Sequence, residues 1–182
     1  MGSPFIVGDR IYLRPLDVDD LDRCLRWIND PELVDRLGRR HPMGRAQEET
    51  WLAGQYERAD HLNLAIVLVD GDRHIGNCGF NAIDSVNRQA EFGILIGEKD
   101  AWGHGYGSEA ARLVLDYGFD ELGLHRISLG VYAFNDRAIR AYEKVGFVLE
   151  GTEREAYFRH GRFHDHHIMS VLASEWRGGR TR

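Results

Sequence analysis

Residues 102–107 of this 182-residue chain read Trp102-Gly103-His104-Gly105-Tyr106-Gly107, with three glycines at alternate positions. The apolar segment 90–96 before them predicts a strand. After them, small or apolar side chains recur at the spacing of one α-helical face, at Ala110, Leu113, Val114, Tyr117 and Gly118. A second strand and helix are predicted over 126–132 and 136–145. This alternation predicts a mixed sheet with helices packed on it.

Weaker patterns extend the prediction to both ends of the chain. Further strands are predicted at 6–13, 64–69, 74–82, 147–158 and 165–172. The carboxylates of 17–20 cap one predicted helix, and another is predicted over 46–59, with an irregular basic loop over 36–45 between them. We therefore expect an α+β fold in one domain over 1–182, with a twisted, mixed, mostly antiparallel sheet of about six to seven strands and about four helices.

Length and composition restrict the classes of function. The chain has 43% hydrophobic and 29% charged residues, the composition of a soluble globular protein. Its net charge of −6 disfavours a general affinity for nucleic acid. Cys24 and Cys78 match neither a disulfide framework nor a CxxC metal pattern, so we expect reduced thiols in a cytoplasmic protein. No apolar run reaches the roughly 18 residues of a membrane span, and residues 1–4 have no signal-peptide character.

The glycine loop has the features of an anion site. Gly103, Gly105 and Gly107 let the backbone approach a ligand and turn its N–H groups inward, and a helix beginning near Ser108 adds its positive dipole end. A flexible turn without a ligand is the alternative. The dinucleotide fingerprint and the P-loop ending are both absent, which disfavours a nucleotide-binding module. The loop therefore predicts a pyrophosphate site.

Two runs, found in the expected order, carry a resemblance to a known superfamily. Ala90 to Ile96 with Trp102 to Ala110 resembles the coenzyme A motif of the GNAT N-acetyltransferases, and Asn135 to Phe147 resembles their second signature. The opening Arg10 to Leu16 and the ending Gly161 to Met169 are similar to the RimJ/RimL-type branch. That branch includes ribosomal-protein N-terminal acetyltransferases and spermidine acetyltransferases.

The resemblance implies transfer of an acetyl group from acetyl-CoA, as cosubstrate, to a primary amine by direct attack in a ternary complex. It implies a coenzyme-binding core at about 90–147, in which the loop binds the pyrophosphate and a splayed strand bonds the pantetheine amides, with one strand N–H serving the oxyanion. The residues so assigned are Ile94, Leu95, Ile96, Trp102, Gly103, His104, Gly105, Tyr106, Gly107 and Ser108. The family usually has Gln or Arg where this chain has Trp102, so we expect only backbone contact there. Asn135 is expected to cap a helix and to lie near the coenzyme.

The chemistry requires a base and a proton donor. An aliphatic amine is only about 0.1% neutral at pH 7.4, and it attacks only when neutral. By resemblance, Tyr142 donates to the departing thiolate; a place on the apolar helix face is the alternative. By resemblance, Glu91 acts as the base through water; a solvent-facing strand carboxylate is the alternative.

Four histidines lie near the C-terminal end, at His160, His164, His166 and His167. Their spacing is no defined zinc pattern and no cysteine lies nearby, so we expect no metal. Strand alternation would place His164 and His166 on one face, with Asp165 and His167 on the other. A role for one histidine in the substrate cleft stays open.

The acceptor is the least defined part of the prediction. The stretch 36–45 carries five basic side chains, Arg36, Arg39, Arg40, His41 and Arg45. In the spermidine enzymes that this chain resembles, the stretch is acidic and helps to bind polyamine. A basic loop would repel a polycation, unless its side chains are merely solvated, so we expect a peptide N-terminus, an amino acid or another small amine. The alternatives are a spermidine acetyltransferase and a non-catalytic acyl-CoA sensor. We expect no nucleic acid or membrane partner, and a homodimer is consistent with the resemblance.

Overall fold

The computed structural model describes residues 2–179, and the chain forms two compact units. The first unit comprises residues 1–79 and 94–113, and the second comprises 80–93 and 114–182. Three elements run from one unit into the other: β4 (His74–Asp84), β5 (Gln89–Ile96) and α4 (Tyr106–Asp116). The glycine loop belongs to the first unit, and the segment Asn135 to Phe147 belongs to the second.

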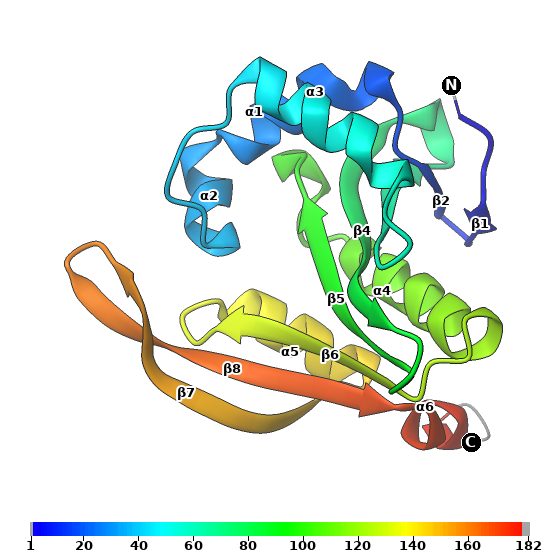
Figure 1. Ribbon diagram of the computed structural model, residues 1–182, viewed down its shortest axis with the longest axis vertical. Coiled ribbons are helices and arrows are strands. Elements are labelled where there is room, and N and C mark those ends of the chain that lie inside the picture. The colour runs from blue at the N-terminus through cyan, green and yellow to red at the C-terminus, as the bar shows by residue number, and fades with distance from the viewer. Residues whose placement is uncertain (1, 180–182) are drawn as a thin grey trace. The chain divides into compact units, whose positions relative to one another are not determined.

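Eight strands form one sheet in the order β1-β2-β3-β4-β5-β6-β8-β7 (Figure 1). The other strands are β1 (Ile6–Val7), β2 (Ile11–Pro15), β3 (Leu62–Leu68), β6 (Arg126–Tyr132), β7 (Val148–Arg159) and β8 (Arg162–Leu172). The pair β5–β6 is parallel, whereas β1–β2, β2–β3, β6–β8 and β7–β8 are antiparallel. The predicted α+β class and mixed sheet are confirmed, and the sheet has more strands than expected.

Six α-helices occur in the described part of the chain, where about four were expected. Besides α4 they are α1 (Leu21–Ile28), α2 (Pro31–Leu37), α3 (Arg45–Ala53), α5 (Asp136–Val145) and α6 (Ala173–Gly179). The short 3-10 turns are Val18–Asp20, Gly54–Tyr56, Asp70–Asp72 and Lys99–Ala101, and a π-helical turn, Tyr117–Glu121, extends α4. The prediction missed α2 and α6.

The strand predicted over 6–13 is two strands joined by a tight turn. The Gly8 N–H donates to the Ile11 carbonyl at 2.9 Å, and β1 then pairs with β2, with Ile6 opposite Leu13. A Cβ at Gly8 would lie 2.9 Å from the Leu113 side chain and 3.0 Å from the Ile11 carbonyl oxygen. The turn therefore favours glycine, because a side chain there would require the Leu113 side chain and the Ile11 carbonyl to shift.

The predicted basic loop over 36–45 is shorter in the structure, because helices take both of its ends. Helix α2 begins after Asp30, whose carboxylate caps the N–H groups of Glu32 and Leu33, and it ends at Leu37, before Gly38 with φ of 71°. Helix α3 begins at Arg45 and ends at Ala53, so the helix predicted over 46–59 is wrong beyond Ala53.

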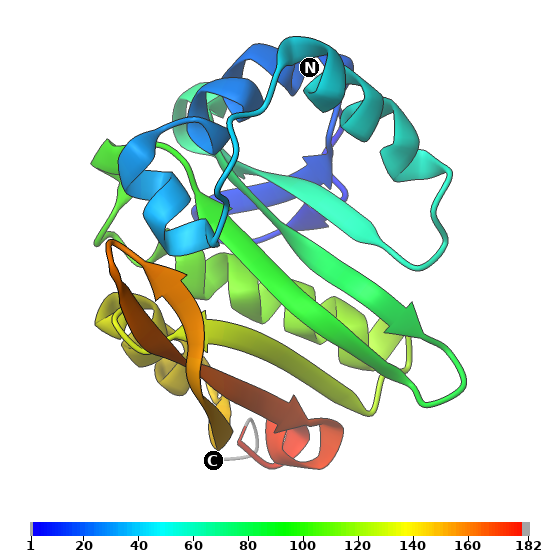
Figure 2. The ribbon, with the colours of Figure 1, turned by 60° about the vertical axis from the view of Figure 1, so that its left-hand side comes forward.

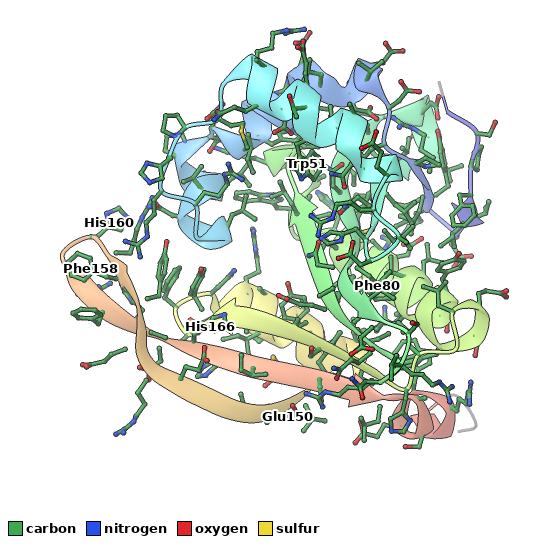
Figure 3. The ribbon with its side chains drawn as sticks, in the orientation of Figure 1. Trp51, Phe80, Glu150, Phe158, His160 and His166 are labelled. Atoms are coloured by element: carbon green, nitrogen blue, oxygen red, sulfur yellow. The ribbon has the colours of Figure 1, made fainter. Side chains whose placement is uncertain are left out.

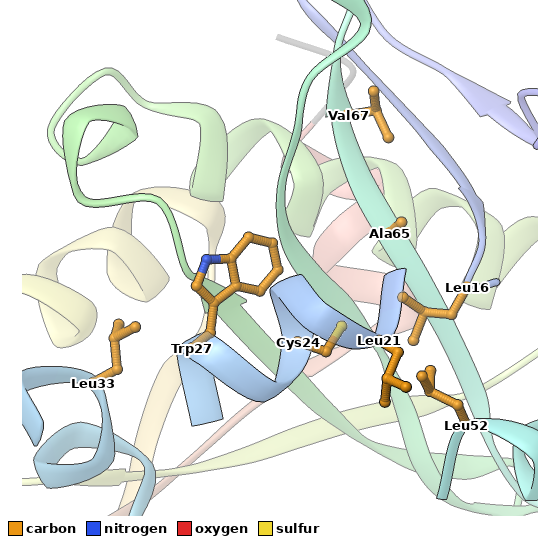
Figure 4. Packing of buried hydrophobic residues seen from close by; sticks show 8 residues of the cluster. All are labelled: Leu16, Leu21, Cys24, Trp27, Leu33, Leu52, Ala65 and Val67. Atoms are coloured by element: carbon orange, nitrogen blue, oxygen red, sulfur yellow. The ribbon is translucent and has the colours of Figure 1, made fainter. Parts of the chain in front are cut away.

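The first unit has an apolar cluster and a buried ionic network. Eight buried side chains form the cluster shown in Figure 4: Leu16, Leu21, Cys24, Trp27, Leu33, Leu52, Ala65 and Val67. The Arg14 guanidinium donates to both Asp20 oxygens at 2.7 and 2.8 Å, and His74 Nδ1 lies 3.0 Å from the same carboxylate. Burial opposes the charge on Asp20, but hydrogen bonds from Arg14, His74 and the Asp17 N–H outweigh it and hold the pKa of this carboxyl well below its usual range.

The second unit contains β6 and the long β7–β8 hairpin, which continues into α6 (Figures 1 and 2). Along β6, Ile127, Leu129 and Val131 are buried. Ser128, Gly130 and Tyr132 alternate with them and are more exposed. The sheet in this unit therefore has one face turned to the core and one face open to solvent.

Candidate active site

The glycine loop of the first unit has the backbone that its sequence predicts. Gly103 and Gly105 have φ angles of 79° and 84°, a left-handed conformation that other residues rarely adopt. Residues 103–105 are exposed. Helix α4 begins at Tyr106, two residues before the predicted Ser108, so Tyr106, Gly107 and Ser108 form its first turn. Exposed loop amides directly before the positive end of an eleven-residue helix form a suitable anion site.

Arg10 holds this loop in place. Its Nη1 donates to the His104 carbonyl at 2.9 Å, while its Nε and its backbone N–H donate to the Glu109 carboxylate at 2.8 and 2.9 Å. Its guanidinium also lies 4.9 Å from the centre of the Tyr106 ring. The sequence prediction did not assign Arg10 to the site. The only signal for it was its position in the opening run that carried the resemblance.

Trp102 anchors the loop through its side chain. The indole Nε1 donates to the Ile96 carbonyl at 2.8 Å, and the ring packs against the apolar cluster of the first unit. The Arg36 guanidinium lies 5.4 Å from the centre of its ring. The side chain is therefore engaged within the protein, and the expectation that only the Trp102 backbone serves a ligand stays a prediction.

The end of β5 is fixed by β4 and supports the loop. The N–H groups of Gly97 and Glu98 donate to the Ile75 carbonyl at 2.8 and 3.1 Å. The side chains of Ile94, Leu95 and Ile96 are half-buried. A Cβ at Gly107 would lie 3.6 Å from the Ile96 side chain and 3.9 Å from that of Ile94, so the first turn of α4 rests on these residues.

Tyr142 lies in the second unit, on α5, between two aromatic rings. Phe92 of β5 contacts it edge-on, with centroids 6.4 Å apart, and Phe147 does so at 5.8 Å. Burial raises the pKa of Tyr142 to about 12, so its hydroxyl keeps its proton at neutral pH. On the same helix, the Asn135 side chain accepts from the Ala138 N–H at 3.4 Å, which confirms the predicted cap.

Glu91 is an exposed carboxylate on β5. The parallel ladder pairs Gln89 with Arg126, Ala90 with Ile127 and Glu91 with Ser128. Paired residues point to the same side of a sheet, so Glu91 lies on the open face of the second unit, with Ser128.

The C-terminal histidines divide between the two faces of β8 as predicted. His164 contacts the Phe134 ring at 4.9 Å and His166 contacts the Tyr132 ring at 5.3 Å. His167 points away from them, and its Nδ1 lies 2.8 Å from the Thr152 hydroxyl. His160 lies in the turn between β7 and β8, as Figure 3 shows. Among residues 2–179, no group of three His, Cys, Asp or Glu side chains could hold a metal ion.

Comparison with known proteins identifies the family. Residues 10–148 match the family model described as the acetyltransferase (GNAT) domain, and this match covers more than half of the chain. The chain belongs to the GNAT acetyltransferases. The predicted family and the N-acetyltransferase class of enzyme are thereby confirmed. The assignment of all 182 residues to one acetyltransferase domain stays a prediction.

Individual relatives match this GNAT acetyltransferase over most of their length. Spermidine N(1)-acetyltransferase of Vibrio cholerae is 35% identical over 171 residues, which are 93% of this chain and 97% of that protein. The uncharacterized N-acetyltransferase p20 of Bacillus licheniformis is 32% identical over 178 residues, with the same two coverages. The crystal structure of the Vibrio cholerae spermidine N-acetyltransferase in complex with CoA and spermine has a TM-score of 0.87 at 26% identity, and the match covers 93% of this chain and 99% of that one.

In this GNAT acetyltransferase, nearby carboxylates offset part of the charge of the basic stretch. Arg36 lies 3.8 Å from Glu32, and Arg45 pairs with Asp22 and, at 3.3 Å, with Glu49. The stretch is therefore less basic than its sequence suggests. Within residues 2–179, no helix is long and apolar enough to cross a membrane.

Proposed function

We propose that this GNAT chain transfers an acetyl group from acetyl-CoA to a primary amine by direct attack in a ternary complex. The N–H groups of residues 102–108 bind the pyrophosphate, and the backbone of Ile94, Leu95 and Ile96 bonds the pantetheine amides. The observation that carries this proposal is the pair of left-handed glycines, Gly103 and Gly105, directly before α4 and fixed by Arg10. The ladder between β5 and β6 ends at Glu91, before Ile94, which further supports the role of the strand backbone.

In this proposal, Tyr142 assists the departure of the coenzyme sulfur. Its pKa of about 12 lies above the value of about 8.5 for an ordinary thiol, so complete proton transfer to the thiolate is uphill. A hydrogen bond from the hydroxyl to the developing thiolate is therefore its main contribution, and the proton that the sulfur finally takes comes from solvent. Asn135 completes the coenzyme contacts. A non-catalytic sensor would not need this donor.

The acceptor in this proposal is a peptide N-terminus, an amino acid or another small amine. The basic stretch 36–45 favours an acceptor that carries a carboxylate or phosphate beside its amine. Spermidine is the second candidate, for two reasons. The charges of Arg36 and Arg45 are offset by Glu32, Asp22 and Glu49, and the Vibrio cholerae relative is a spermidine acetyltransferase.

The proposal is tested by measuring CoA thiol release from acetyl-CoA with a panel of peptides, amino acids and polyamines. We expect turnover, with kcat/KM higher for a peptide or amino acid than for spermidine. Higher kcat/KM for spermidine would reverse the order of the two candidates. Binding of acetyl-CoA without thiol release from any amine would establish the sensor instead.

The role of Tyr142 is tested by Tyr142→Phe, which removes only the hydroxyl. We expect kcat to fall about 100-fold, because the thiolate loses its donor in a water-poor site, while KM for acetyl-CoA changes little. Tyr12→Phe is a matched control, because the Tyr12 hydroxyl is bonded to Asp72 in another part of the chain. Full kcat in Tyr142→Phe would leave Tyr142 as a packing residue only.

A further inference from the structure

His166 and Glu153 form a hydrogen-bonded pair on the open face of the second unit. His166 Nδ1 lies 2.9 Å from a Glu153 carboxylate oxygen. An ionised carboxylate can only accept, so the neutral ring carries its proton on Nδ1 and its lone pair on Nε2. This arrangement fixes the tautomer that can take up a proton at Nε2.

The backbone of β6 determines where that nitrogen lies. A Cβ at Gly130 would fall 2.5 Å from both Cε1 and Nε2 of His166, so the ring lies directly on the strand. Gly130 follows Ser128, the last β6 residue in the ladder with β5, by two positions. The absence of a side chain at Gly130 therefore makes room for the basic edge of His166 just beyond the point where the ladder ends.

The same face carries Glu91, the residue that the family resemblance assigns as a base acting through water. Glu91 is opposite Ser128 in the ladder, and Tyr132, two residues after Gly130, is opposite His166 in β8. Paired and alternate residues share a face, so Glu91 and His166 lie on one side of the sheet. Leu129 and Val131 point to the other side and are buried.

The His166 ring is partly shielded from solvent. Its side chain is 26% exposed, whereas that of Glu153 is 60% exposed. The Tyr132 ring lies 5.3 Å from it, centre to centre, and stacks in turn on Tyr157 at 4.1 Å. Titratable groups in contact with this cluster include Glu153 and Tyr157 from β7, Tyr132 from β6 and His164 from β8. About a quarter of the His166 side chain is therefore open to solvent, and its bond to Glu153 holds the ring in one orientation.

We propose that His166, positioned by Glu153, is the general base that deprotonates the acceptor amine. This inference rests on the proposed acetyl transfer and specifies its base. The ammonium form of the acceptor gives one proton to Nε2, and the neutral nitrogen attacks the acetyl carbon. The tetrahedral adduct loses a second proton as the C–S bond breaks. One proton is finally taken up by the coenzyme sulfur, one is released to solvent, and no oxidant or other co-reactant is needed.

Imidazole suits this task better than the exposed carboxylate of Glu91. A general base is most effective when its own proton affinity matches the operating pH, and among side chains this is the property of histidine. Glu91 is solvent-facing. In this proposal Glu91 orders water on the same face, and His166 takes the proton.

The test compares His166→Gln with His167→Gln across pH 7 to 9.5, with one amine acceptor. We expect His166→Gln to lower kcat/KM at pH 7 about 100-fold, and the loss to shrink as the pH rises, because more of the amine is then neutral without a base. His167→Gln, on the opposite face of the same strand, should retain the parent value at every pH. Glu153→Gln, which keeps the ring but loses its anionic partner, should give a smaller loss with the same pH trend.

Two further measurements distinguish the loss of a base from misfolding of the variant. Acetyl-CoA binding and the thermal unfolding midpoint should be unchanged in His166→Gln, which excludes misfolding as the cause of the loss. A loss no larger than that of His167→Gln, or one that stays constant with pH, would overturn the proposal while leaving acetyl transfer intact. Absence of turnover in the parent with every amine would instead reject the proposed function itself.

Discussion

The glycine loop and the open face of the second unit are built in different ways. The loop takes its shape from the backbone of six consecutive residues, and Arg10 braces it with one hydrogen bond to the His104 carbonyl and two to Glu109 of α4. The open face brings together residues that are far apart in the sequence: Gly130 on β6, Glu153 on β7 and His166 on β8. The glycine loop is therefore local in sequence and made of main-chain groups. The open face depends instead on the register of the strands, which aligns residues from three different strands.

This difference predicts different kinetic consequences. Under the proposed function, a change in the loop should act on the affinity for acetyl-CoA, because the loop N–H groups would contact the donor equally in the ground state and in the transition state. If His166 is the base, a change on the open face should act on kcat, because a proton would move there only during the reaction. Variants in each region can test whether effects on KM for acetyl-CoA and effects on kcat separate between the loop and the open face.

Among the glycine and arginine variants that compare the two regions, the largest effect is expected from Gly105→Val in the loop. A β-branched residue at φ of 84° is strained by about 1–3 kcal/mol, and the Cβ would also lie 3.4 Å from Arg10 Nη2. If this strain opens the loop, KM for acetyl-CoA should rise about 30-fold while kcat falls much less. Steady-state kinetics with acetyl-CoA varied at saturating amine measures both.

Gly71→Val provides the matched control. Gly71 has a similar φ of 75° and open space around its Cβ, but it lies in the turn after β3. We expect a similar loss of thermal stability and no change in KM for acetyl-CoA. Equal KM changes in the two variants would mean that general strain, and not the loop, controls coenzyme binding.

The same contrast explains what the sequence could and could not predict. The alternating glycines, the strand before them and the helix after them all lie within residues 90–118, so pattern and spacing were sufficient to place the loop. Arg10 was not found because its partners, His104 and Glu109, lie more than ninety positions later in the chain.

The open face was predicted only in part. Strand alternation correctly placed His164 and His166 on one side of β8. The partner of His166 was not predictable, because the β7–β8 register shifts between Leu149 and Gly151 and again after Glu153. Such irregularities depend on the backbone of both strands, which no local pattern encodes. Helix α2 was missed for a different reason, since its signal, Asp30 followed by Pro31, was present but not used.

An intermediate effect is expected from Gly130→Ala on the open face. The new methyl group would meet the His166 ring at 2.5 Å, so the ring must move and loosen its bond to Glu153. We expect kcat to fall about tenfold, as for partial loss of a general base, with KM for acetyl-CoA unchanged. A double-mutant cycle with His166→Gln provides the control. Gly130→Ala should have little further effect in that background, whereas independent, additive losses would show that it acts elsewhere.

The smallest effect is expected from Arg10→Ala, which removes the brace but leaves the glycines. The Arg10 side chain is 52% exposed and that of Glu109 is 16% exposed, so solvent screens much of this ion pair, and its contribution is about 1 kcal/mol. KM for acetyl-CoA should rise about fivefold. Added salt should reduce the difference between the variant and the parent, because salt screens the Arg10–Glu109 pair that only the parent contains. Arg58→Ala is the matched control, since it removes a surface arginine paired only locally, with Asp60 at 3.2 Å, and it should leave KM unchanged. A fall in kcat at constant KM in Arg10→Ala would contradict the division between a loop that binds the donor and a face that deprotonates the acceptor.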